Sequence, residues 1–348
     1  MPDTLIPPRL TSLAHGGGCG CKLAPNVLAD ILSEMPLALG SKDLIVDAGT
    51  SDDAAVYRVN DTTALVATTD FFTPIVDDPY TFGKIAATNA LSDIYAMGAK
   101  PIFSLAIVGM PVDKLPPETI RAILAGGQSV AEAAGAPVAG GHSIDVGEPI
   151  YGLVALGIGH PDRLLLNSRA QAGDVLILGK PLGIGIYSAG LKREILSPEQ
   201  YAEMIASTTR LNTPGAELSA MEGVHAATDV TGFGLLGHGS EMARGAGVSL
   251  VIEKDKVPVF EGARALANEG VKTGASGRNW ESVKALVSGE MSHVERDLLC
   301  DPQTSGGLLV ACAPETAGDV LARFAAHGHV GAAIVGRVES GPASVRVA

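Results

Sequence analysis

The sequence predicts a mixed α/β protein built from two domains. Its 348 residues are too many for one ordinary hydrophobic core, so two domains of about 150 to 190 residues are expected. Stretches with strand character and helix character alternate along the chain, which is typical of α/β and α+β folds. Aromatic residues make up only 4% of the chain, so the cores must pack mainly Ala, Val, Leu and Ile.

In the first half, predicted strands and helices alternate up to a domain boundary at residues 159–162. Apolar residues in segment 24–34 recur at helical spacing and predict a first helix. The Asp-Pro pair at 78–79 and the stop signals Gly98 and Pro101 predict a second helix over 80–97. The other predicted elements are strands at 54–57, 63–69, 102–109, 139–145 and 150–159, and a helix at 117–134.

The second half continues the mixture of strands and helices. Asp229 and Thr231 precede a glycine turn and a helix that runs to about Arg244. A helix N-terminus preceded by such residues is a natural place for an anion or a metal. The remaining predicted elements are strands at 174–178, 248–252 and 306–312, and a helix at 198–211.

The charge balance is acidic, with 38 Asp and Glu against 25 Lys and Arg and a net charge of −13. This argues against a nucleic-acid partner, because phosphate backbones are bound through an excess of basic residues. An acidic enzyme that handles phosphorylated substrates would need metal ions to bring the negative charges together. Solubility is the simpler interpretation of the charge when it is taken alone.

The sequence also predicts a cytoplasmic protein that is not embedded in a membrane. Four cysteines, at 19, 21, 300 and 312, do not make a disulfide framework in a chain of this size. The first residues lack the basic and apolar regions of a secretory signal. The longest uncharged apolar runs, 101–112 and 150–159, are shorter than the roughly 20 residues that span a bilayer.

The segment from His15 to Lys22 reads His-Gly-Gly-Gly-Cys-Gly-Cys-Lys, and it concentrates reactive side chains. It holds two thiols, an imidazole and an ammonium group, but no large apolar side chain. Since it has almost nothing to bury and glycine loses much entropy on ordering, we predict a mobile loop that contributes nothing to a core.

Three functional interpretations of these cysteines are open. A zinc or copper site made by Cys19, Cys21 and His15 lacks a fourth ligand, and the one-residue spacing is unlike structural zinc sites. A redox pair usually has two residues between its cysteines. The residue chemistry favours a nucleophilic thiol whose pKa is lowered by Lys22 and His15. The non-functional alternative is a surface loop whose cysteines take part in no chemistry.

Aspartates 53, 70, 93 and 229 each stand in a polar or small-residue setting beside an apolar element. Asn89 and Asp93 project from one face of the predicted helix 80–97, and they need either a ligand or structural hydrogen-bond partners there. Each aspartate alone is typical of a cap or turn. Together with glycine turns that can present N–H groups to phosphate, they indicate a nucleotide site with Mg²⁺, although no Walker motif is present.

Further motifs follow the His15–Lys22 segment over almost the whole chain. They are Asp-Asp-Ala-Ala-Val-Tyr at 52–57, Thr-Thr-Asp-Phe-Phe at 68–72, Ala-Thr-Asn-Ala-Leu-Ser-Asp at 87–93, Ala-Gly-Gly-His-Ser-Ile-Asp at 139–145, Asp-Val-Thr-Gly-Phe-Gly at 229–234 and Asp-Pro-Gln-Thr-Ser-Gly-Gly at 301–307. In this order they resemble the selenophosphate synthetase (selenide, water dikinase) family. The later motifs are shared in part with the aminoimidazole ribonucleotide synthetase superfamily, from which the Cys-Gly-Cys-Lys loop separates the chain.

The resemblance implies a reaction in which ATP, selenide and water give selenophosphate, AMP and phosphate. It implies dependence on Mg²⁺ and a homodimer that associates through the sheets of its N-terminal domains, with the nucleotide site shared between subunits. It also implies three parts: a flexible catalytic arm at 1–22, an ATP- and Mg²⁺-binding domain at 23–160, and an α/β sandwich at 161–348.

The resemblance also implies roles for individual residues. Cys19 and Lys22 match the catalytic cysteine and the catalytic lysine that contacts ATP. The residues that match magnesium ligands are Asp53, Asp93 and Asp229. The residues expected to bind ATP, besides Lys22 and Asp93, are Thr50, Ser51, Asp52 and Asp70, with Gly141, His142 and Ser143 reaching the ATP of the partner.

Two other function classes remain open at this stage. Another ATP-dependent kinase or ligase of the same superfamily would end its reaction at ADP rather than AMP. A non-enzymatic thiol metal carrier would bind zinc or copper tightly and would not hydrolyse ATP.

Overall fold

The computed structural model describes residues 8–23, 27, 31, 41–46 and 52–348. Within them, the first half of the chain forms a six-stranded sheet in the order β1-β2-β3-β6-β4-β5. Neighbouring strands are antiparallel except for the parallel pair β4 and β5. The strands are β1 (Leu44–Val46), β2 (Ala55–Asn60), β3 (Thr63–Phe72), β4 (Lys100–Met110), β5 (Val138–Asp145) and β6 (Ile150–Gly159).

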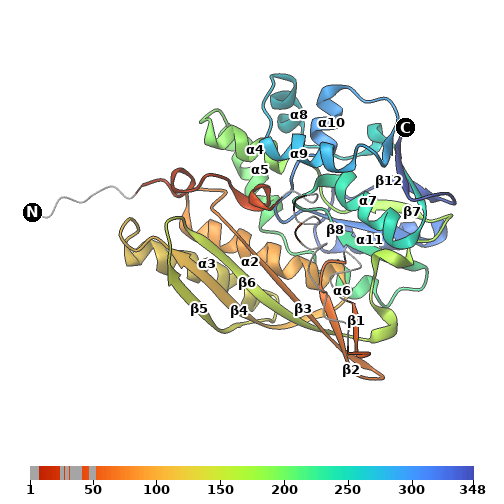
Figure 1. The fold of residues 1–348 in the computed structure, drawn as a ribbon, viewed down its shortest axis with the longest axis horizontal. Helices are drawn as coiled ribbons and strands as arrows, with labels where there is room; N and C mark the ends of the chain where they lie inside the picture. Colours follow the sequence, from red (N-terminus) through yellow and green to blue (C-terminus); the bar gives the residue numbers. More distant parts are fainter. Residues whose placement is uncertain (1–7, 24–26, 28–30, 32–40, 47–51) are drawn as a thin grey trace, which may run out of the picture.

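Two long helices, α2 (Pro79–Ala96) and α3 (Pro117–Ala133), cover one face of this sheet (Figure 1). Successive side chains of a strand point to opposite faces, so Asp70 faces the helices while Phe71 faces away from them. Glycines allow the two helices to touch, because a Cβ on Gly83 would collide with the carbonyl of Ile123. The opposite face of the sheet is not covered by any described element of the chain.

The second half forms a seven-stranded sheet in the order β10-β13-β9-β12-β7-β11-β8, again within the described residues. Apolar side chains of this sheet alternate between two cores: one packs under α7, and the other under α6 and α11. This is the α/β sandwich expected for the second half. Its strands are β7 (Val175–Leu178), β8 (Val224–Asp229), β9 (Ser249–Ile252), β10 (Val287–Ser288), β11 (Leu308–Cys312), β12 (Ala333–Glu339) and β13 (Ser344–Val347).

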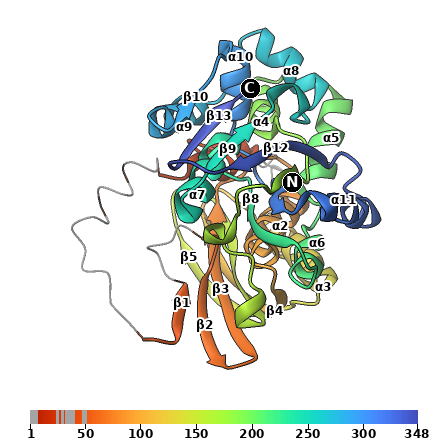
Figure 2. The same cartoon turned by 90° about the vertical axis from the view of Figure 1, so that its right-hand side faces the viewer.

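The helices of the second half lie on both faces of its sheet and next to the first half (Figure 2). Helix α2 contacts α5, α6 and β8, so it joins the two halves. The helices are α4 (Ile184–Lys192), α5 (Pro198–Thr208), α6 (Pro214–Leu218), α7 (Gly234–Ala246), α8 (Glu261–Asn268), α9 (Gly274–Val283), α10 (His293–Leu299) and α11 (Ala317–Ala326).

The predicted elements of the first half are confirmed to within about three residues at each end. The predicted first helix at 24–34 lies outside the described residues apart from Val27 and Ile31. In the second half, α4, α8, α9, α11, β8 and β12 were not predicted. Helix α4 begins inside a Gly-rich stretch, where its backbone N–H groups are capped by the distant Asp301 rather than by a local residue.

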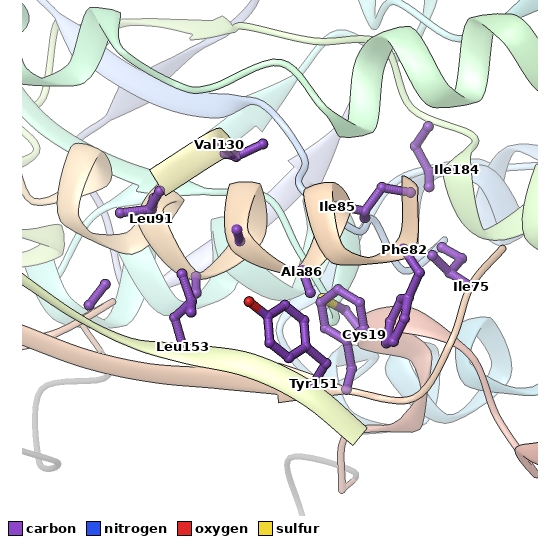
Figure 3. Close-up of a cluster of buried hydrophobic side chains, with 14 of the residues drawn as sticks. Cys19, Ile75, Phe82, Ile85, Ala86, Leu91, Val130, Tyr151, Leu153 and Ile184 are labelled. Atoms are coloured by element: carbon purple, nitrogen blue, oxygen red, sulfur yellow. The ribbon is translucent and has the colours of Figure 1, made fainter. Parts of the chain in front are cut away.

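The His15–Lys22 segment does contribute to a core, contrary to the prediction. Its residues Gly18–Cys21 form a 3₁₀ helix, η2, and Cys19 is only 1% exposed. Figure 3 shows Cys19 close to Phe82 of α2 and Tyr151 of β6, in one cluster of buried apolar side chains. A thiol is small and apolar enough to pack as a hydrophobic group. Its burial therefore helps to offset the entropy lost when the surrounding glycines are ordered.

All four cysteines are free thiols. None of the described helices is long and apolar enough to cross a membrane.

Candidate active site between the two halves

The turn η2 is held from both halves of the chain. The backbone N–H of Gly18 donates to the carbonyl of Thr73, just beyond β3. The N–H of Cys19 donates to Oγ1 of Thr304 at 3.1 Å, a contact that spans 285 residues of sequence. Gly18 has a φ of +55°, and a Cβ there would collide with Thr304, so only glycine fits this position.

A chain of hydrogen bonds connects Cys19 to Lys22 through α2 and β3. The thiol of Cys19 donates to Oδ1 of Asn89 at 3.3 Å, and Nδ2 of Asn89 donates to Oδ2 of Asp70 at 2.7 Å. The same Asp70 oxygen accepts Nζ of Lys22 at 3.0 Å. Oδ1 of Asn89 also accepts the N–H of Ser305 at 2.6 Å, so one amide joins the arm, the first sheet and the 301–305 turn.

The prediction of a lowered Cys19 pKa is wrong for this arrangement. Burial, the largest influence, raises the pKa of the thiol, and the neighbouring Asp70 adds to the rise. Lys22 acts in the opposite direction but does not offset burial. His15 does not assist, because its ring faces Glu148 at 2.9 Å and its side chain is 75% exposed. Cys19 is therefore a neutral thiol donor here.

Lys22 carries the positive charge of the site. Burial opposes that charge, but Asp70, Cys19 and Asp93 together hold the Lys22 pKa well above its ordinary value. The side chain is still 36% exposed, so the amine reaches into the carboxylates from the solvent side. A cation in this position is accessible to a phosphate group that arrives from outside.

Asp93 and Asp229 lie close enough to Asp70 and Lys22 to interact with them electrostatically, and Asp53 interacts in turn with Asp93 and Asp229. Asp53 precedes β2 and accepts Oγ1 of Thr228 at 2.8 Å, whereas Asp93 of α2 accepts Oγ1 of Thr68 at 2.5 Å. Asp229 ends β8 and is 1% exposed. The aspartates predicted from the sequence therefore do come together in the fold, from three different elements.

Burial raises the pKa of Asp53, Asp93 and Asp229 above the ordinary value for aspartate, and repulsion among these carboxylates adds to the rise for Asp53 and Asp93. Oδ2 of Asp229 is buried without a hydrogen-bond partner in the described part of the chain. Such an oxygen costs free energy unless a cation or a donor reaches it. The donor set is all oxygen, which is the set that Mg²⁺ prefers.

The residues present therefore fit a Mg²⁺ ion. No three His, Cys, Asp or Glu side chains among the described residues already form a closed metal-binding group. This is expected for Mg²⁺, which usually takes one or two carboxylates together with waters and substrate phosphates. The orphaned Asp229 oxygen marks the side from which such a complex would complete the site.

Of the other predicted nucleotide residues, Asp52 adjoins this cluster, whereas the rest lie on β5 or outside the described residues. Thr50 and Ser51 belong to the part of the chain that is not described. Oδ1 of Asp52 accepts the N–H of Asn167, in the connection between the two halves. Gly141, His142 and Ser143 lie on β5, the edge strand of the first sheet, and all three are exposed.

Sequence reasoning missed several residues that hold the site together. Asn89 was noted as a polar residue on an apolar helix face, but no role in the site was assigned to it. Thr304 and Ser305 belong to the Asp-Pro-Gln-Thr-Ser-Gly-Gly motif, and Ser305 has a φ of +50°, which is rare outside glycine. This positive φ angle marks Ser305 as unusual, but it cannot be predicted from the sequence alone.

Comparison with known proteins places this geometry in a family. The family model "AIR synthase related protein, N-terminal domain" matches residues 51–159, and the corresponding C-terminal domain matches residues 171–348. A selenide, water dikinase from Burkholderia ambifaria is 59% identical over 350 residues, covering 99% of each chain. Another from Rhizobium meliloti is 55% identical and covers 98% of this chain and 99% of its own.

Solved structures share the fold at lower identity. A thiamine-monophosphate kinase from Stenotrophomonas maltophilia superposes with a TM-score of 0.64 at 20% identity, over 94% of this chain and 96% of its own. HypE from E. coli gives a TM-score of 0.64 at 21% identity, over 93% of this chain and 92% of its own. The two-domain architecture is thus that of AIR-synthase-like proteins. The chain belongs to the AIR synthase related protein family and, within it, to the selenide, water dikinases.

Proposed function

We propose that this protein makes selenophosphate, converting ATP, selenide and water into selenophosphate, AMP and phosphate. The observation that carries the proposal is the hydrogen-bond chain from Cys19 through Asn89 and Asp70 to Lys22, set beside the carboxylates of Asp53, Asp93 and Asp229. Relatives named selenide, water dikinase match the whole chain, including the cysteine loop, at 53–59% identity. The product would supply activated selenium for selenocysteine and selenium-modified tRNA.

The carboxylate cluster is proposed to hold Mg²⁺ through Asp53, Asp93 and Asp229. When bound, the ion would offset the negative charge of the triphosphate, which these side chains would otherwise repel. Lys22 then has a free path to the phosphates, since part of its side chain is exposed. An ammonium held well above its usual pKa stays charged while phosphoryl groups are aligned beside it.

The nucleotide is proposed to lie along Thr50, Ser51, Asp52, Asp70 and Asp93. Cys19 brings its thiol to this site, where it would assist phosphoryl transfer to selenide without forming a bond to selenium. Because burial keeps the thiol protonated, movement of the loop towards solvent would be needed before it reacts as a thiolate. The loop contains the glycines that such a movement requires.

A homodimer is proposed from the uncovered face of the first sheet. Cross-strand neighbours on this face form apolar rows, such as Tyr57, Leu65 and Ile158 on three adjacent strands. Tyr57, Phe71 and Ile158 are 43–46% exposed. Exposing several large apolar side chains on one sheet face is unfavourable in water and is typical of an interaction surface. His142 borders the same face, opposite Ile107, which supports a role for 141–143 in the site of the other subunit. The cytoplasmic location stays a prediction from the sequence.

The reaction can be tested by following ATP with phosphorus NMR in the presence and absence of selenide. The wild-type protein is expected to form AMP and selenophosphate only when selenide is supplied. Cys19→Ser is expected to abolish selenophosphate, and Lys22→Ala to slow nucleotide turnover by roughly 100-fold or more, because a charged donor to the phosphates is lost. The exposed Lys42→Ala is the matched control. ADP as the final product would instead indicate another kinase of the superfamily.

Asn89 is expected to position both Cys19 and Asp70. Asn89→Ala leaves the Ser305 N–H and the Asp70 carboxylate each without one partner, so the free energy of unfolding should fall by about 1–3 kcal/mol. Turnover should fall by roughly tenfold or more as the thiol loses its orientation. Urea unfolding and initial rates measure the two effects, with the exposed Asn268→Ala as control. Wild-type values for both quantities in Asn89→Ala would refute this role.

Ile158→Glu tests the proposed dimer. A carboxylate buried in the apolar row of Tyr57, Leu65 and Ile158 should convert the dimer to a monomer, as measured by light scattering at micromolar concentration. Val330→Glu, at a site 87% exposed in the second half, should leave the dimer intact. A wild-type protein that is already monomeric, or an Ile158→Glu protein that remains dimeric, would contradict the assignment of this face.

A further inference from the structure

A cavity of about 600 Å³ lies beside η2. Its walls come from three places: the N-terminal segment with Cys21 and Lys22, helix α4 with Lys192, and the start of α9 with Arg278. None of Cys19, Asn89 or the four aspartates lines it. Lys22 is shared between the two regions, because it lines this cavity and also pairs with Asp70.

The two thiols face these two regions. Cys19 points away from the cavity, to Asn89, and is buried. Cys21 lines the cavity, is partly exposed, and its thiol donates to the carbonyl of Gly18 at 2.9 Å. Thr304 also lines the cavity while it binds the N–H of Cys19, so only one layer of residues lies between the cavity and the Cys19 backbone.

The cavity is positively charged in a protein that is strongly acidic overall. Lys22, Lys192, Arg278 and His15 line it, and no Asp or Glu is among the described lining residues. The chain as a whole has 38 acidic and 25 basic residues, so the charge of this lining is opposite in sign to the net charge of the protein. An excess of cations around a concave surface raises the local concentration of anions.

Two of these cations have no carboxylate partner among the described residues. Nζ of Lys192 donates to the carbonyls of Ala14 and His15 at 3.3 and 3.5 Å, and Nη2 of Arg278 donates to the carbonyl of Gly20 at 3.2 Å. Lys22, in contrast, is paired with Asp70. Lys192 and Arg278 thus hold the ends of the cysteine loop and retain charge that a small anion could neutralise.

We infer that this cavity binds the second substrate, the hydroselenide anion, beside Cys21 and between Lys192 and Arg278. The inference rests on the proposed function, which supplies the identity of the anion. The nucleotide occupies the aspartate cluster and hydroselenide the basic cavity, so the two negatively charged substrates need not enter along the same path. Cys19 and Cys21 then divide their work by position: Cys19 faces the phosphates, and Cys21 faces the arriving selenium.

The charge of the cavity can be tested without enzyme activity, by alkylating Cys21 with iodoacetate, an anion, and with iodoacetamide, its neutral counterpart. Mass spectrometry of the Cys21 peptide gives the ratio of the two rates. Removing both charges in Lys192→Ala/Arg278→Ala should lower the iodoacetate-to-iodoacetamide ratio by roughly threefold or more. Lys192→Arg/Arg278→Lys should keep the ratio, and the exposed Arg264→Ala serves as control. An unchanged ratio in the double alanine variant would overturn the inference, whatever the enzyme does.

Kinetics then identify the anion. In Arg278→Ala and Lys192→Ala, the KM for selenide should rise by roughly fivefold or more while the KM for ATP is unchanged. The charge-conserving variants should restore the KM for selenide, which a merely structural role would not predict. Equal rises in both KM values would overturn the assignment to selenide. Wild-type protein that forms no AMP with selenide would instead overturn the proposed function, and the alkylation ratio would still report on the cavity.

Discussion

The close approach of Asp53, Asp70, Asp93 and Asp229, with the amine of Lys22 beside three of them, is the constraint on which the site depends. Four carboxylates and one ammonium cannot all be charged in a partly buried space without strong repulsion. Asp70 is satisfied by Lys22 and Asn89, whereas the pKa of each of the other three is raised and Asp229 keeps an orphaned oxygen. The fold therefore has a local deficit of positive charge that a bound divalent cation would reduce.

The same ion pair gives the N-terminal segment its place. Lys22 and Asp70 fix the end of η2, Arg278 binds its Gly20 carbonyl and Thr304 binds its Cys19 N–H. Lys192 holds the carbonyls of Ala14 and His15 ahead of it. The contacts of η2 are mainly hydrogen bonds to a glycine-rich backbone, and within η2 only Gly18 and Cys19 are buried. A segment held in this way can be released locally without unfolding either half, which is what a loop that handles substrate requires.

Much of the fold and the chemistry of the site could be predicted from local patterns. The spacing of Asn89 and Asp93 on one helix face predicted a shared environment, and the aspartates beside apolar elements do converge. Distant contacts could not be predicted in the same way: Thr304 and Ser305 meet the first half across more than 200 residues. The burial of Cys19 was also not predicted, and neither was the direction of its pKa shift. The glycines of the loop indicate how much entropy it loses on ordering, but they do not show which residues pack over it.

The most direct test of this account is whether the buried aspartates bind the metal. Mn²⁺ in place of Mg²⁺, with a non-hydrolysable ATP analogue, can be followed by electron paramagnetic resonance. We expect Asp53→Asn and Asp229→Asn to weaken Mn²⁺ binding by roughly tenfold or more while the circular dichroism spectrum is retained. The exposed Asp113→Asn should bind Mn²⁺ as the wild type does. Wild-type affinity in both Asp53→Asn and Asp229→Asn would contradict the account.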